Sequence, residues 1–241
     1  IKVNFYKRNE MRDSYNELNL NFKEDFSLVF RAYNDGMAYR FVDNTKKNFT
    51  VNNEVATFNF DKDYKAYIPY VKGNHETIES QYFNSFENTY AYISLSEMNP
   101  QRLAFAPVVI ELNGGKKLCI TESDLESYPG MYLINDNNST TLKANFAPYP
   151  ALETEGGYSN LQQMVTKREP FIANCKAGSK FPWRIVIITN SDKELLVNDM
   201  VYKLASPSRI SDLSWVKPGK VSWDWWNNLG LYNVDFEVGI N

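Results

Sequence analysis

The sequence predicts a mainly β protein, a large antiparallel β-sandwich, on three observations. Short segments that alternate apolar and polar residues recur along most of the chain. Turn-forming Asn, Asp, Gly and Pro residues separate these segments, and no long stretch repeats its apolar residues with the period of a helix. Aromatic residues, which strands favour, make up 15% of the 241 residues.

The first part of the chain contains a predicted hairpin. Residues 18–22 and 26–30 alternate apolar and polar positions, and residues 37–41 do so again after Asn34-Asp35-Gly36. Asn, Asp and Gly tolerate positive φ, so this triplet predicts a tight turn between antiparallel strands. Residues 1–6 alternate like a strand already in progress, so we expect the natural N-terminus to lie upstream.

The central part of the chain continues in the same style. Strand patterns occupy residues 58–60 and 90–93. Residues 108–112 lead into Asn113-Gly114-Gly115, and residues 117–121 return from it, which predicts a second tight hairpin.

Toward its end the chain first shows a helical and then a strand pattern. Residues 160–165 are compatible with one or two turns of helix, and residues 183–189 form an almost continuous apolar run that predicts a buried strand.

The character of the sequence changes near residue 204. Pro- and Gly-bearing segments at 205–208 and 217–220 are typical of a linker. Residues 221–241 begin with a short strand pattern and are too few to fold alone. We therefore expect a sandwich over 1–204, lacking its first strands, a linker over 205–220, and the opening of a second domain over 221–241.

Composition and motifs exclude several function classes. The net charge is −3, whereas a nucleic-acid surface needs a basic excess, and no apolar run is long enough to span a membrane. His75 is the only histidine, no Gly-rich nucleotide motif occurs, and the two cysteines allow one disulfide at most, a buried free thiol being the simpler reading for Cys119.

Two groups of residues are candidates for chemistry. Glu122 and Asp124 follow an apolar strand, and because they are two residues apart in extended backbone we expect them to point the same way. Paired carboxylates of this kind could bind a hard cation such as calcium. The alternative is that they are merely solvated acidic residues at the end of a strand. The segment Trp223–Asn227 combines three indoles with a carboxylate and an amide, and it either contacts sugar or fills a core.

A long ordered set of segments resembles glycoside hydrolase family 97, the bacterial α-glucosidase and α-galactosidase family. The resemblance covers essentially the whole chain and is carried by residues 33–41, 120–125, 128–131, 181–184, 199–205 and 215–227. The last of these, Trp215-Val216-Lys217-Pro218-Gly219-Lys220-Val221-Ser222-Trp223-Asp224-Trp225-Trp226-Asn227, is the most specific.

The resemblance implies an exported, periplasmic, calcium-dependent and exo-acting α-glycosidase acting on oligosaccharides. Its architecture would be an N-terminal β-super-sandwich, a (β/α)8 catalytic barrel and a small C-terminal β domain, with residues 221–241 as the first strand and loop of a truncated barrel. Glu122 matches the position of a calcium ligand that the sandwich lends to the active site, whereas Asp124 has no such support.

For the substrate, the resemblance makes Asp224, Trp226 and Asn227 candidates for sugar contact, because the carboxyl ends of barrel strands build such sites. The two catalytic carboxyl groups would come from later strands, beyond Asn241, so no residue here is assigned as acid, base or nucleophile. The form of the Trp-Asp-Trp-Trp-Asn segment is more similar to the retaining, α-galactosidase-type branch.

Two other functions compete with the role of an enzyme part that supports the barrel. The first is a non-catalytic carbohydrate-binding β-sandwich module, because fold alone does not decide function. The second is a purely structural interdomain piece, which differs from the enzyme part only in the role of Glu122.

Overall fold

The computed structural model describes residues 1, 10–157 and 160–220. Of these, Ile1 and residues 11–206 form one unit, and Glu10 and residues 207–220 belong to a second. The predicted barrel strand at 221–241 and most of the strand pattern at 1–6 lie outside the described residues. The division at residues 204 and 220 therefore stays a prediction.

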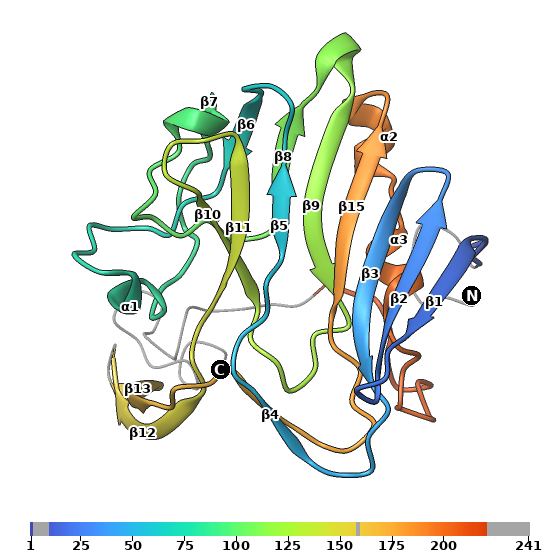
Figure 1. Ribbon diagram of the computed structural model, residues 1–241, viewed down its shortest axis with the longest axis vertical. Coiled ribbons are helices and arrows are strands. Elements are labelled where there is room, and N and C mark those ends of the chain that lie inside the picture. The colour runs from blue at the N-terminus through green and yellow to red at the C-terminus, as the bar shows by residue number, and fades with distance from the viewer. Residues whose placement is uncertain (2–9, 158–159, 221–241) are drawn as a thin grey trace. The chain divides into compact units, whose positions relative to one another are not determined.

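The larger unit is built on one antiparallel sheet of eight strands, in the order β1-β2-β3-β15-β9-β8-β6-β7 (Figure 1). The strand bounds are Asn16–Asn21 (β1), Phe26–Tyr33 (β2), Gly36–Asp43 (β3), Lys65–Ile68 (β6), Ala91–Ser94 (β7), Val108–Glu111 (β8), Lys117–Ser123 (β9) and Trp183–Thr189 (β15). The apolar run predicted as a buried strand is β15, which pairs between β3 and β9 in the middle of the sheet.

The two predicted hairpins are confirmed. Tyr33 lies opposite Gly36, so Asn34 and Asp35 alone connect β2 to β3. Between β8 and β9 the turn contains Gly114 and Gly115, whose φ angles of 75° and 79° suit glycine and strain other residues.

Smaller sheets form the second layer. The first joins β10 (Met131–Asn135), β11 (Thr141–Phe146) and β5 (Thr57–Asn59), and the second pairs β4 (Phe49–Val51) with β14 (Ala173–Cys175). Apolar residues of both layers meet in the main core, among them Ile68, Ile110, Ile120, Leu133 and Leu142, all fully buried. The predicted fold class, a large antiparallel β-sandwich, is confirmed.

The outer face of the large sheet carries a second core at β3, β9 and β15. The helix α3 (Met200–Leu204) packs there with Trp183 and Ile185, and α2 (Asp192–Leu196) adds Leu195. Two guanidinium groups lie near the Trp183 ring, with Arg31 Cζ at 4.9 Å and Arg40 Cζ at 4.2 Å from its centroid. These cation–π contacts bring charged side chains of β2 and β3 over a fully buried indole.

Helices are few and short among the described residues. Besides α2 and α3 they are α1 (Ile78–Gln81) and two single 3₁₀ turns, η1 (Leu95–Glu97) and η2 (Asn113–Gly115). No helix in the described part of the chain is long and apolar enough to cross a membrane.

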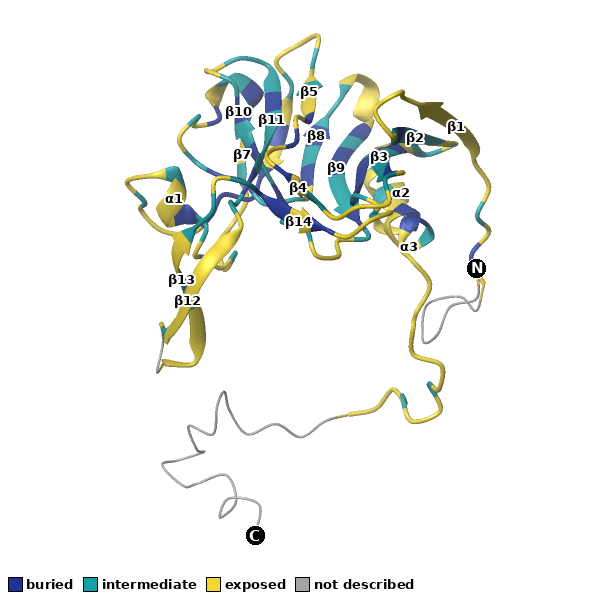
Figure 2. Cartoon of the chain, turned by 60° about the horizontal axis from the view of Figure 1, so that its bottom comes forward, coloured by how far each residue is buried: buried dark blue, intermediate teal, exposed yellow. Residues whose placement is uncertain are grey.

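The prediction of a short helix over residues 160–165 is wrong. This segment enters β13 (Gln162–Arg168), which pairs with β12 (Pro150–Gly156) in a hairpin that is exposed along nearly its whole length (Figure 2). The segment has too few apolar residues to give a helix a complete apolar face. The β-branched residues Val165 and Thr166 favour the strand. Pairing with β12 supplies backbone partners that an isolated short helix would lack.

Gly36 packs closely against the backbone of β15. A Cβ at this position would lie 2.4 Å from the Val186 carbonyl oxygen, a backbone atom that cannot move aside cheaply. We expect Gly36→Ala to lower the free energy of unfolding by about 3 kcal/mol. The control is Gly178→Ala, where φ is also positive but the Cβ meets open space, and the expected loss is about 1 kcal/mol. Equal losses in urea unfolding would contradict the packing at Gly36.

Both cysteines are free and buried, as the simpler reading of Cys119 expected. Burial raises the pKa of Cys119 to about 12 and also raises that of Cys175. Since the thiolate is the reactive form, we expect neither thiol to react with a disulfide reagent at about pH 8 in the folded protein, and both to react in urea. Rapid modification of one thiol without urea would contradict this packing.

Candidate functional site

Glu122, the predicted metal ligand, lies near the end of β9 on the inner face of the large sheet. Side chains of a strand alternate between faces, so Glu122 shares its face with Ile120, which belongs to the main core. In the register between β9 and β15, Glu122 stands opposite Arg184. Its side chain is 14% exposed, which is low for a carboxylate.

Arg184 is a fully buried charge in the middle of the sandwich. Its Nε and Nη2 donate to the two carboxylate oxygens of Glu54, each at 2.7 Å, and its Nη1 donates to Glu122 Oε2 at 2.5 Å. Glu54 comes from the segment between β4 and β5, in the second layer, and its side chain is 3% exposed. One guanidinium therefore joins two carboxylates from the two layers of the sandwich.

Two further groups complete this cluster. The Tyr128 hydroxyl donates to Glu54 Oε2 at 2.8 Å, and the backbone N–H of Met131, the first residue of β10, donates to Glu122 Oε1 at 3.0 Å. The Phe146 ring lies beside the guanidinium, 4.9 Å from Arg184 Cζ to the ring centroid. Glu54, Glu122, Tyr128 and Arg184 are called the Arg184 cluster below.

The charges of the Arg184 cluster do not balance, because two carboxylates face one guanidinium. Burial raises the pKa of Glu122, and the nearby Arg184 and the Met131 N–H only partly oppose this rise. For Arg184, burial lowers the pKa but the hydrogen bonds and charges of the two carboxylates outweigh it, so the guanidinium stays protonated. With both carboxylates ionised the cluster has a formal charge of −1, which suits a cation nearby.

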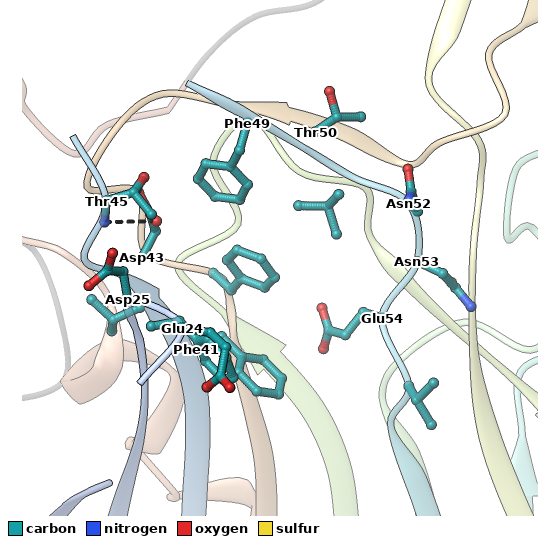
Figure 3. Close-up of a pocket in the computed structure, with 15 residues that line it drawn as sticks. Glu24, Asp25, Phe41, Asp43, Thr45, Phe49, Thr50, Asn52, Asn53 and Glu54 are labelled. Atoms are coloured by element: carbon teal, nitrogen blue, oxygen red, sulfur yellow. Dashed lines mark hydrogen bonds between the residues drawn. The ribbon is translucent and has the colours of Figure 1, made fainter. Parts of the chain in front are cut away.

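A pocket of about 540 Å³ borders the cluster at Glu54. Apolar side chains, among them Phe41, Phe49 and Phe181, line it together with carboxylates and amides, and no Lys, Arg or His does so among the described residues. Figure 3 shows Glu54 across this pocket from Asp43 and Thr45.

The expectation that Asp124 points the same way as Glu122 is wrong. Asp124 has a φ of 61°, which ends the strand and turns its carboxylate away. Its oxygens accept from Arg40 Nη1 at 3.1 Å and from the Ser206 backbone N–H and hydroxyl at 2.8 and 2.9 Å. Because Arg40 lies over Trp183 on the outer face, the two carboxylates serve opposite faces of the sheet.

A complete metal site does not form within the described residues, where no three His, Cys, Asp or Glu side chains come together. Calcium takes six to eight oxygen ligands, so Glu122 could supply only part of such a set. The predicted sugar-contact residues Asp224, Trp226 and Asn227 lie outside the described residues, and their role stays a prediction.

Sequence reasoning missed Arg184 as the partner of Glu122. It also missed Glu54, which holds Arg184, and Tyr128, which holds Glu54 in turn. The available signal was Arg184 itself, a charge next to Trp183 at the start of an otherwise apolar strand. A buried Arg needs carboxylate partners, but their positions more than 50 residues away depend on how the strands pair.

A family model matches most of the chain, and two curated proteins match it in sequence. Residues 1–207 match the family model described as Glycosyl-hydrolase 97 N-terminal. The chain is 50% identical over 238 residues to a protein named retaining alpha-galactosidase from Bacteroides thetaiotaomicron, covering 98% of this chain and 36% of that protein. It is 25% identical over 201 residues to a probable retaining alpha-galactosidase from Streptomyces bingchenggensis, covering 83% of this chain and 26% of that one.

Solved structures show the same fold at low identity. A glycoside hydrolase family 97 enzyme from a Pseudoalteromonas species, solved with acarbose, matches with a TM-score of 0.66 and 19% identity, over 91% of this chain and 30% of that one. A beta-arabinopyranosidase matches with a TM-score of 0.55 and 16% identity, over 73% and 28%. The chain thus spans about a third of the length of these proteins.

Arg184 compensates the charges of the buried carboxylates Glu54 and Glu122, so its removal should destabilise the fold. Arg184→Met leaves two buried carboxylates without their cation, and we expect the free energy of unfolding to fall by about 3–5 kcal/mol near neutral pH. The unpaired carboxylates then have raised pKa values, so the folded variant takes up protons as the pH falls and the loss shrinks near pH 5. Urea unfolding at both pH values measures this.

The control is Lys65→Met, which removes an exposed ion pair with Glu97 and should cost less than about 1 kcal/mol. A loss for Arg184→Met that is as small as the control, or that grows on acidification, would contradict the arrangement of the cluster.

Proposed function

Because the chain belongs to glycoside hydrolase family 97, we propose that it is the N-terminal part of a calcium-dependent, exo-acting retaining α-galactosidase. The observation that carries this proposal is 50% identity, over 98% of the chain, to a protein named retaining alpha-galactosidase. Of the two activities that the sequence left open, α-galactosidase and α-glucosidase, this relative supports the first. The proposed substrates are oligosaccharides with terminal α-galactosyl units.

In this proposal the sandwich supports the catalytic barrel and supplies Glu122 as a calcium ligand. Glu122 is suited to be one ligand of such a site. Each of its carboxylate oxygens accepts one hydrogen bond and keeps a lone pair for another partner. The surplus negative charge of the Arg184 cluster also suits a cation. The other ligands, the catalytic carboxyl groups and the sugar contacts of Asp224, Trp226 and Asn227 belong to the barrel.

When bound, calcium would supply Lewis-acid polarisation of the glycosidic oxygen near the leaving group. The tasks of this chain's own residues are to hold the Glu122 carboxylate, through Arg184 and the Met131 N–H, and to keep it largely out of water. Export to the periplasm is part of the proposal on the family resemblance alone.

The test is Glu122→Gln in the intact enzyme. We expect the calcium concentration that gives half-maximal turnover of an aryl α-galactoside to rise roughly tenfold or more, because one anionic ligand is lost. Activity is measured after chelation and stepwise return of calcium. Glu153→Gln, an exposed position on β12, is the control and should behave as the wild type.

Unchanged calcium dependence in Glu122→Gln would refute the ligand role. A wild-type enzyme that hydrolyses aryl α-glucosides but not aryl α-galactosides would refute the proposal that α-galactosides are the substrates.

A further inference from the structure

Glu122 is not free to choose its own orientation. Oε1 accepts from the Met131 N–H and Oε2 accepts from Arg184 Nη1, so both oxygens have a fixed protein partner. A ligand carboxylate with this support presents its remaining lone pairs in one direction. What fixes Arg184 therefore also fixes Glu122.

Arg184 is fixed mainly by Glu54. The planar guanidinium fork meets the Glu54 carboxylate with two parallel hydrogen bonds of 2.7 Å, whereas it reaches Glu122 through Nη1 alone. The Tyr128 hydroxyl holds Glu54 Oε2 in turn, at 2.8 Å. Since Arg184 and Glu54 are almost fully buried, water cannot replace these contacts easily.

The arrangement divides the guanidinium unequally between the two carboxylates. Without the fork at Glu54, Arg184 would be able to turn its fork to Glu122 and occupy both of its oxygens. A carboxylate held bidentately by a guanidinium has its charge closely compensated and has fewer free lone pairs for a metal. The pair with Glu54 prevents this competition.

We propose that Glu54 and Tyr128 are positioning residues, which act through Arg184 to hold Glu122 in the orientation and with the free oxygen lone pairs that calcium binding requires. This inference rests on the proposed function, in which Glu122 is a calcium ligand. Neither Glu54 nor Tyr128 needs to touch the ion for this role. Their effect is on the affinity of the site and not on the chemical step.

The experiment measures the calcium dissociation constant of the intact, chelator-treated enzyme by isothermal titration calorimetry. The variants are Glu54→Asp, which keeps the charge but shortens the side chain and breaks the fork, Glu54→Gln, which keeps the shape but removes the charge, and Tyr128→Phe, which removes only the hydroxyl. Glu122→Gln is the reference for loss of the ligand and Glu153→Gln the control.

We expect both Glu54 variants to raise the dissociation constant about tenfold, the lower end of the range seen when groups behind a metal ligand are removed. Tyr128→Phe removes one neutral hydrogen bond and should raise it roughly threefold. Turnover at saturating calcium should recover in all three. Unfolding of the calcium-free variants is followed in parallel, and titrations are made well below each melting temperature. Should the Glu54 variants fail to fold, Tyr128→Phe alone decides.

Wild-type affinity in Glu54→Asp and Tyr128→Phe, beside a weakened Glu122→Gln, would overturn the positioning inference and leave the ligand role intact. Wild-type affinity in Glu122→Gln would overturn both. A loss in Glu54→Gln without one in Glu54→Asp would also overturn the inference, because charge and not position would then be responsible.

Discussion

The structure depends on a single buried guanidinium that joins the two layers of the sandwich. Arg184, in the central strand β15, binds Glu122 on the neighbouring strand β9 and Glu54 on the segment between β4 and β5. A buried ion pair adds little net stability compared with apolar packing, because desolvation opposes it. Its value here is geometric, since it fixes which part of the second layer faces which part of the sheet.

The same constraint relates the fold to the proposed calcium site. The large sheet needs an apolar inner face, and Ile120 follows that rule while Glu122, two residues further on, departs from it. Departures of this kind are expected at functional sites. The cost of burying the Glu122 carboxylate, visible in its raised pKa, is offset by Arg184, the Met131 N–H and, in the proposal, a metal ion.

Much of the fold could be predicted from the sequence, because its strands alternate clearly and its turns contain Asn, Asp and Gly. The hairpin at Asn34 and Asp35 and the buried strand at Trp183–Thr189 are examples. The β12–β13 hairpin was missed because exposed strands lack an apolar alternation, and its identity depends on pairing. The direction of Asp124 was missed because a positive φ at a non-glycine residue has no strong sequence signal. Glu122 was found through the family resemblance, whereas its contact with Arg184, and the contacts of Arg184 with Glu54 and of Glu54 with Tyr128, form only after the layers pack.

A crystal structure of the intact enzyme with calcium, in which the ion is located by its anomalous scattering, would show directly whether Glu122 binds the ion and how Arg184 holds it. We expect a Glu122 oxygen about 2.3–2.6 Å from calcium, with the Arg184 fork still on Glu54. A calcium ion bound elsewhere, with Glu122 engaged by Arg184 through both oxygens, would contradict it.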